Sequence, residues 1–188
     1  MLKYIEENGK YVELTGFKNV KIADAEKFLE KIRKEKQPNI ETQFFDARLV
    51  ATWQHLYFAV LNALTAFKNR ENISKSLEVE IMLYASAQRQ IQKAIRLLGI
   101  HHDSSDIAVV IVGEEPERLR TALSTIARHI NAHPDETALE LTREKMGVIQ
   151  KAFKISDEEL ETVRKKDGLE EALTSLVIER VALLTTRR

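Results

Sequence analysis

A run of polar residues stands in front of a short apolar helix pattern in the segment YASAQRQIQKAIRLLGI, Tyr84 to Ile100. The apolar spacing predicts a helix over Gln88–Leu98 that Gly99 ends. Its first turn would present free backbone N–H groups, which bind phosphate, and the neighbouring Arg89 would add positive charge. Glutamine side chains there can read base edges or ribose hydroxyls of RNA. The candidate contacts are Ser86, Gln88, Arg89 and Gln90, with Lys93 behind them. The alternative interpretation is a solvated turn made of good helix formers.

The histidines offer a second group of candidates. His55 is expected in the first turn of the most regular helix pattern, either as a partly exposed surface residue or as a contact to a polar ligand. The segment His101–Asp106 (HHDSSD) could bind a metal, but a solvated loop is the simpler interpretation. His129 and His133 are four residues apart, as helical metal ligands are, but they also suit the C-terminal end of a helix dipole.

Composition excludes several classes of function. The chain has no cysteine, which rules out disulfides, thiolate catalysis and cysteine-ligated metals. Its six glycines are scattered, so neither a phosphate-binding loop nor a dinucleotide fingerprint fits. Lys plus Arg and Asp plus Glu each number 29, which gives no support for bulk nucleic-acid binding. No signal peptide and no membrane-spanning run is seen, so a cytoplasmic protein without metal or cofactor is expected.

The elements that must position these residues can be read along the chain. The pattern predicts a mixed α/β (α+β) fold with helices packed around a small sheet, as a single domain over residues 1–188 with a helical C-terminal section from about 134. Ser76–Ala87 fits either a strand or a helix, and its residue types favour a helix. Strands are predicted within Lys10–Ile22, as one or two short pieces around a turn, and at Ile40–Phe45 and Asp106–Gly113. Further helices are predicted at 23–36, 52–69, 114–130, 142–155, 156–166 and 169–184.

The last predicted helix is apolar almost all round. A helix of this kind must be buried on more than one side. It therefore lies in the centre of the fold or docks on a partner, and the sequence leaves both possibilities open. The apolar residues of interest are Leu173, Leu176, Val177, Ile178, Val181 and Leu184.

Three segments together resemble a known family. They are FFDARLVATWQHLYFAVLNALTAF, LEVEIMLYASAQRQIQKAIRLLGI and the apolar strand IAVVIVG. They are similar to the regulatory, kinase-binding subunit of the archaeal and eukaryotic KEOPS complex, the TPRKB-like family. The resemblance covers about Gly16 to Gly113 and extends more loosely to the end of the chain. The Ser-x-x-Arg-Gln-Ile block that begins at Ser86 is its most specific part.

The resemblance implies a non-enzyme in a tRNA-modification complex. Another subunit of KEOPS installs threonylcarbamoyl-adenosine beside the anticodon, while this family binds a PRPK-like kinase and holds the 3′ CCA end of tRNA. The tRNA contacts are then expected at Ser86, Gln88, Arg89, Gln90, His55 and Lys93. From the helix pattern, the six apolar residues of the last helix are assigned to the kinase interface and the adjoining core. The free chain could also self-associate as a homodimer through that apolar surface. The competing hypotheses are a structural adaptor without RNA contact and a small hydrolase that uses His55 and Glu80.

Overall fold

A four-stranded antiparallel sheet forms the centre of the molecule, with the strand order β1-β2-β4-β3. The computed structural model describes residues 1–164 and 168–186. Val12 lies opposite Val112 and Phe45 opposite Ala108, which fixes the register on both sides of the central strand. The strands are β1 (Leu2–Ile5), β2 (Lys10–Phe17), β3 (Glu41–Asp46) and β4 (Ile107–Gly113).

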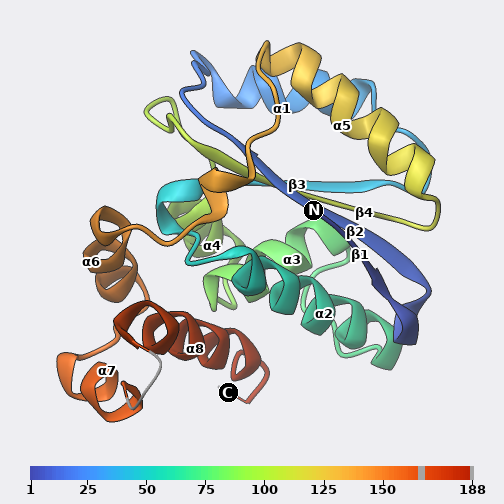
Figure 1. Cartoon of the computed structure of the whole chain (residues 1–188). Helices are drawn as coiled ribbons and strands as arrows, with labels where there is room; N and C mark the ends of the chain where they lie inside the picture. The colour runs from blue at the N-terminus through green and yellow to red at the C-terminus, as the bar shows by residue number, and fades with distance from the viewer. Residues whose placement is uncertain (165–167, 187–188) are drawn as a thin grey trace.

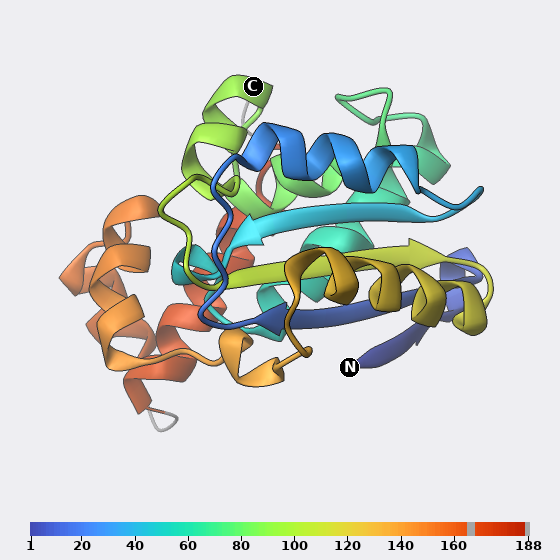
Figure 2. The ribbon, with the colours of Figure 1, turned by 90° about the horizontal axis from the view of Figure 1, so that it is seen from above.

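Helices cover both faces of this sheet (Figures 1 and 2). On one face lie α1 (Ala25–Lys34) and α5 (Pro116–Ile130); on the other lie α2 (Trp53–Asn69), α3 (Leu77–Ser86) and α4 (Ile91–Leu98). Beyond them follow α6 (Arg143–Ala152), α7 (Asp157–Val163) and α8 (Gly168–Ala182), and α8 packs along α2. Short 3-10 turns lie at Glu6–Asn8 (η1), Ala47–Leu49 (η2) and Glu136–Leu139 (η3). The predicted mixed α/β fold with helices around a small sheet is confirmed.

Strand β4 divides the interior into two hydrophobic cores. Its residues alternate across the sheet, as successive side chains of a strand must. Ala108, Val110 and Val112 belong to the core beneath α2, α3 and α8. Ile107, Val109 and Ile111 belong to the core beneath α1 and α5. The continuous apolar run that predicted a central strand is therefore explained by burial on both faces.

The N-terminal part of the sheet differs from the prediction at two points. β1 was not anticipated, and it pairs with β2 through a short connection that Gly9 completes at φ 60°. β2 continues through Gly16, where a turn was expected. A Cβ at Gly16 would lie 2.5 Å from Cβ of Ala138 and 2.9 Å from the carbonyl oxygen of Ile107. This glycine therefore permits a close approach between the sheet and the segment before α6.

The segment Ser76–Ala87, which fitted either a strand or a helix, forms α3, the helix that its residue types favoured. Ser76 caps α3 by accepting a hydrogen bond from the backbone N–H of Val79. The predicted capping box of α7 is also present, because Ser156 and Glu159 each accept a hydrogen bond from the other's backbone N–H. Among the described residues, the structure has no helix whose length and apolar character suit a bilayer crossing.

Candidate functional site

The polar run forms the connection between α3 and α4. α3 ends at Ser86, and Ala87 follows in the left-handed conformation with φ 51°. The N–H of Ala87 donates to the oxygen of Tyr84, and the N–H of Gln88 donates to the oxygen of Leu83 at 3.1 Å. These two hydrogen bonds are the usual closure of a helix C-terminus.

The helix after the polar run begins later than predicted. α4 starts at Ile91 with Gln90 as its N-cap, so Gln88 and Arg89 precede the helix instead of forming its first turn. Arg89, Gln90 and Lys93 are exposed, and Gln88 is half-buried. The exposed polar groups therefore surround the N-terminus of α4, where the first backbone N–H groups lack partners within the helix.

Ser86 is placed differently from its neighbours. It is fully buried, and its hydroxyl donates to the oxygen of Leu83 at 3.1 Å within α3. This hydrogen bond satisfies the hydroxyl inside the protein. The expectation of a Ser86 side chain accessible at the turn is therefore wrong, and Ser86 contributes to the shape of the helix end.

His55 is also buried, which corrects the expected surface position. Its exposed fraction is 0%, its Nε2 lies 2.7 Å from the oxygen of Ala85, and its Nδ1 accepts from the N–H of Ala51 at 3.3 Å. These partners select the neutral form with the proton on Nε2. Burial lowers the pKa of His55 to about 4. The ring thus joins the end of α3 to the start of α2, and it is a positioning residue for the polar turn.

Beside the turn lies a polar cleft of about 540 Å³. Its other walls come from the end of α6, the α6–α7 connection, α7 and α8. Arg180, mostly buried, forms an ion pair with Glu159 across two of these walls. Hydrogen bonds from the backbone of Ser156 and from Arg180 hold the pKa of Glu159 below its usual value. The lining residues are Ser86, Ala87, Gln88, Ala152, Phe153, Lys154, Glu159 and Arg180.

The predicted docking residues of α8 lie mainly inside the protein. Five are buried in the core shared with α2 and the sheet: Leu173, Leu176, Val177, Val181 and Leu184. These five therefore belong to the adjoining core of the predicted interface and offer no accessible surface to a partner. Ile178 is half-buried and lines a second cleft together with Trp53 at the start of α2.

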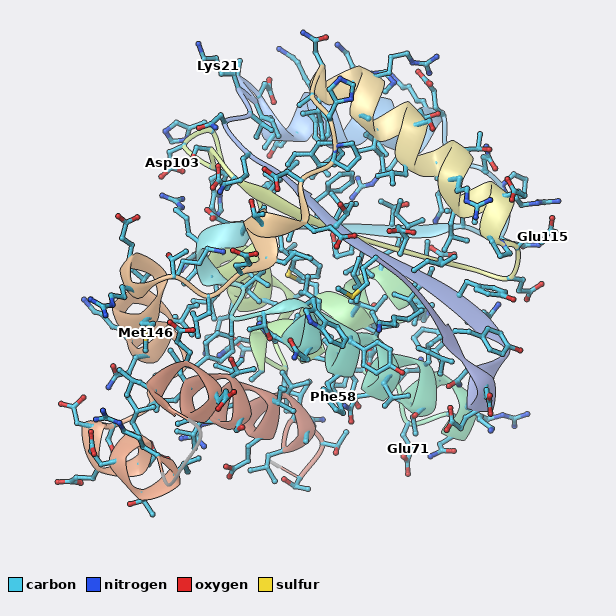
Figure 3. All side chains as sticks on the ribbon, viewed as in Figure 1. Lys21, Phe58, Glu71, Asp103, Glu115 and Met146 are labelled. Atoms are coloured by element: carbon cyan, nitrogen blue, oxygen red, sulfur yellow. The ribbon has the colours of Figure 1, made fainter. Side chains whose placement is uncertain are left out.

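The aromatic side chains of α2, of which Trp53 shares a cleft with Ile178, were not singled out from the sequence. Trp53 and Tyr57 lie one helical turn apart on α2, with ring centroids 6.1 Å apart, and the centroid of Phe58 lies 5.8 Å from that of Tyr57. Phe58 is exposed on α2 (Figure 3). The signal was available, because WQHLYF places three aromatics in the first two turns of the helix. We call Trp53, Tyr57, Phe58 and Ile178 the aromatic surface.

The apolar stripe predicted for α4 is divided between core and solvent. Ala94 and Leu98 are buried, whereas Ile91 and Ile95 are 43% and 50% exposed. These two isoleucines lie four residues apart and so share one face of the helix. They border the exposed Arg89, Gln90 and Lys93 side chains along the chain.

The other candidate chemistries lack a shared site within residues 1–164 and 168–186. No group of three or more histidine or acidic side chains there could hold a metal ion. His129 instead pairs with Glu35 at 2.9 Å. Glu80 is buried and accepts hydrogen bonds from the N–H groups of Ile73 and Ser74, so it forms no pair with His55. The suggested His55–Glu80 hydrolase site is therefore not assembled.

Similarity to known proteins places this fold in a family. Residues 17–185 match the family described as kinase binding protein CGI-121. The chain is 34% identical over 116 residues to regulatory protein Cgi121 of Methanocaldococcus jannaschii, and the aligned region covers 62% of this chain and 72% of the relative. It is 25% identical over 175 residues to EKC/KEOPS complex subunit CGI121 of Candida glabrata, and this aligned region covers 92% of this chain and 91% of the relative. Because the family match spans most of the sequence, the chain belongs to the CGI-121 family.

Proposed function

We propose that this chain is a non-catalytic KEOPS subunit that binds the PRPK-like kinase and holds the single-stranded 3′ CCA end of tRNA for threonylcarbamoyl-adenosine modification. The observation that carries the RNA part is the exposed cluster of Arg89, Gln90 and Lys93 at the N-terminus of α4 beside a polar cleft. The family description, kinase binding protein CGI-121, supports the kinase part, and the name of the relative EKC/KEOPS complex subunit CGI121 supports the KEOPS part.

The geometry suits a short single-stranded end. Arg89, Lys93 and the free N–H groups of α4 can neutralise one or two phosphates. Gln88, which lines the cleft, offers both donors and acceptors to an unpaired base or ribose. Lys154 adds positive charge to the same cleft, in which Arg180 is already paired with Glu159. A few local contacts of this kind are compatible with the zero net charge of the chain.

The RNA contact is tested by charge reversal at two positions. Arg89→Glu and Lys93→Glu are each expected to weaken tRNA binding by about tenfold or more, the usual effect of losing a charge-assisted contact. Lys31→Glu on α1, across the sheet, should leave binding unchanged. Binding to full-length tRNA and to tRNA without its CCA end should be compared at one salt concentration, because phosphate contacts depend on salt. Unchanged affinity in both variants would contradict this RNA site, and absence of tRNA binding by the unchanged chain would leave a protein adaptor without RNA contact.

The kinase is proposed to dock on the aromatic surface. Tryptophan and tyrosine are enriched among the residues that dominate binding energy at protein interfaces. Trp53 and Tyr57 are half-buried and Phe58 is exposed, so these side chains can offer apolar area to a partner in their present positions. Ile178 extends the surface onto α8. The five buried residues of that helix then support the surface from beneath.

The docking surface is tested with Ile178→Glu. Because Ile178 is half-buried, the variant is expected to fold and to lose kinase binding. Val148→Glu, an exposed apolar position on α6, is the matched control and should bind normally. Circular dichroism would establish folding, and calorimetric titration with the purified kinase would measure affinity. Normal binding by a folded Ile178→Glu variant would contradict the assignment.

A further inference from the structure

A second cleft of about 540 Å³ lies where the start of α2, the segment after η3 and α8 meet. Its apolar lining includes Trp53, Leu141 and Ile178, so it continues the aromatic surface. Thr174 and Ser175 line it from α8. The remaining lining residues are Thr52, Gln54, Leu139, Glu140, Glu170 and Glu171.

The charge of this cleft is one-sided. Glu140, Glu170 and Glu171 line it, and the described residues of its lining include no lysine, arginine or histidine. All three glutamates are exposed, and none forms an ion pair with a described residue. Two basic groups lie at the border of the cleft: the Nζ of Lys145 donates to the backbone oxygen of Glu140 at 2.9 Å, and the Nζ of Lys3 lies 4.7 Å from the centroid of the Trp53 ring. Trp53 thus already attracts an ammonium group at the border of the cleft.

Two polar atoms of the lining residues lack partners. Thr52 Oγ1 and Gln54 Oε1 are buried without a hydrogen bond to any described residue. Thr52 is the N-cap of α2, but its side chain makes no capping hydrogen bond. Buried acceptors of this kind are stabilised when a donor reaches them. The Gln54 side chain can present its oxygen to such a donor by rotation about its own bonds.

We propose that this cleft receives an arginine or lysine side chain of the protein partner. The aliphatic part of that side chain would pack on Trp53 and Ile178, as long basic side chains do on apolar surfaces. Its charged end would lie among the three carboxylates. The inference rests on the proposed kinase docking at the aromatic surface and adds the charge that the partner must present. A phosphate backbone is disfavoured here because the carboxylates would repel it.

The test neutralises the cleft without changing its shape. A triple variant combines Glu140→Gln, Glu170→Gln and Glu171→Gln. The purified kinase subunit should bind it at least tenfold more weakly than the unchanged chain at low salt. The difference should shrink at high salt, because screening weakens charge pairs. The control is Glu26→Gln, Glu30→Gln and Glu117→Gln on α1 and α5, which removes the same charge from the other side of the sheet and should bind normally.

The outcomes separate this inference from the docking proposal. If Ile178→Glu abolishes binding and the triple variant binds normally with unchanged salt dependence, the docking surface is correct and the basic side chain is wrong. If both variants bind the kinase normally, the docking surface itself is wrong. If the triple variant loses tRNA binding but keeps kinase binding, the cleft serves RNA and the inference fails. Thermal melting of each variant identifies loss of folding, in which case the single Glu140→Gln variant, outside α8, repeats the test.

Discussion

The guanidinium of Arg89 donates a hydrogen bond to the backbone oxygen of Leu184, with its nitrogen 3.3 Å from that oxygen. Leu184 lies two residues beyond the last residue of α8, so the contact joins the α3–α4 turn to the end of the C-terminal helix. A positive charge at this end also complements the helix dipole. Arg89 thus has a structural contact as well as its proposed contact to RNA.

Arg89→Gln should lower the free energy of unfolding by about 0.5–1 kcal/mol, as expected for one partly buried hydrogen bond and the dipole contact. Lys93→Gln, whose side chain forms no hydrogen bond or ion pair within the described residues, should leave stability unchanged. Chemical denaturation of both variants measures the difference. Equal stability would show that the Arg89 contact contributes nothing in solution.

His55 should make stability depend on pH. Its folded-state pKa of about 4 lies below the unfolded value of about 6.5. The folded state therefore binds the proton less readily than the unfolded state. The stabilisation that neutral His55 contributes is fully present above pH 6.5 and is lost as the pH falls toward 4. The loss in the free energy of unfolding is up to about 3 kcal/mol for a fully buried group.

Denaturation from pH 7 to pH 4 checks this expectation. Carboxylates titrate near the lower end of the same range, so the variant His55→Gln serves as the reference. It should be less stable at pH 7 but should lose less stability on acidification. Parallel curves for the two proteins would show that His55 does not titrate as the buried ring requires.

Gly16→Ala should destabilise the fold by about 1–3 kcal/mol, the usual cost of overpacking. The added methyl group would meet Ala138 and the backbone of Ile107, and neither can move without shifting the sheet or η3. Gly147→Ala is the matched control, because a Cβ there meets nothing within 4 Å on α6. That change should instead stabilise the protein by about 1 kcal/mol through helix propensity. Thermal unfolding of both variants would show shifts of opposite sign.

Ala87→Gly should stabilise the protein by about 0.5–1 kcal/mol. A left-handed alanine costs about 1–2 kcal/mol, and glycine removes that strain but adds freedom to the unfolded chain. Ala122→Gly in the regular part of α5 should destabilise by about 1 kcal/mol. Denaturation midpoints compare the two, and a loss of stability in Ala87→Gly would contradict the strained turn.

Much of the fold could be predicted because its signals are local. The β-branched run of β4 and the regular spacing of α2 depend on burial that the sequence itself displays. β1 was missed because four residues carry little periodicity and depend on pairing with β2. Gly16 was read as a turn because the close approach of Ala138, far away in the sequence, leaves no local trace.

The candidate site was predicted less evenly. The exposed positions of Arg89, Gln90 and Lys93 followed from the polar run, whereas the burial of His55 depends on Ala85 and Ala51 meeting its ring. The start of α4 was placed three residues too early, because Gln88 and Arg89 suit a helix but follow the left-handed Ala87. For α8 the apolar pattern was correct. Only the packing against α2 decides that Ile178 is the accessible one of the six residues named from that pattern.

The division of the interior by β4 has a consequence for local unfolding. α1 and α5 cover a core of their own, whereas the polar turn, the aromatic surface and α8 share the other core. Such contiguous units often open independently of one another. Partner binding should therefore slow backbone amide exchange in α2, α3 and α8 and leave the rates of α1 and α5 nearly unchanged, so the molecule would respond as two cooperative halves that meet at one strand.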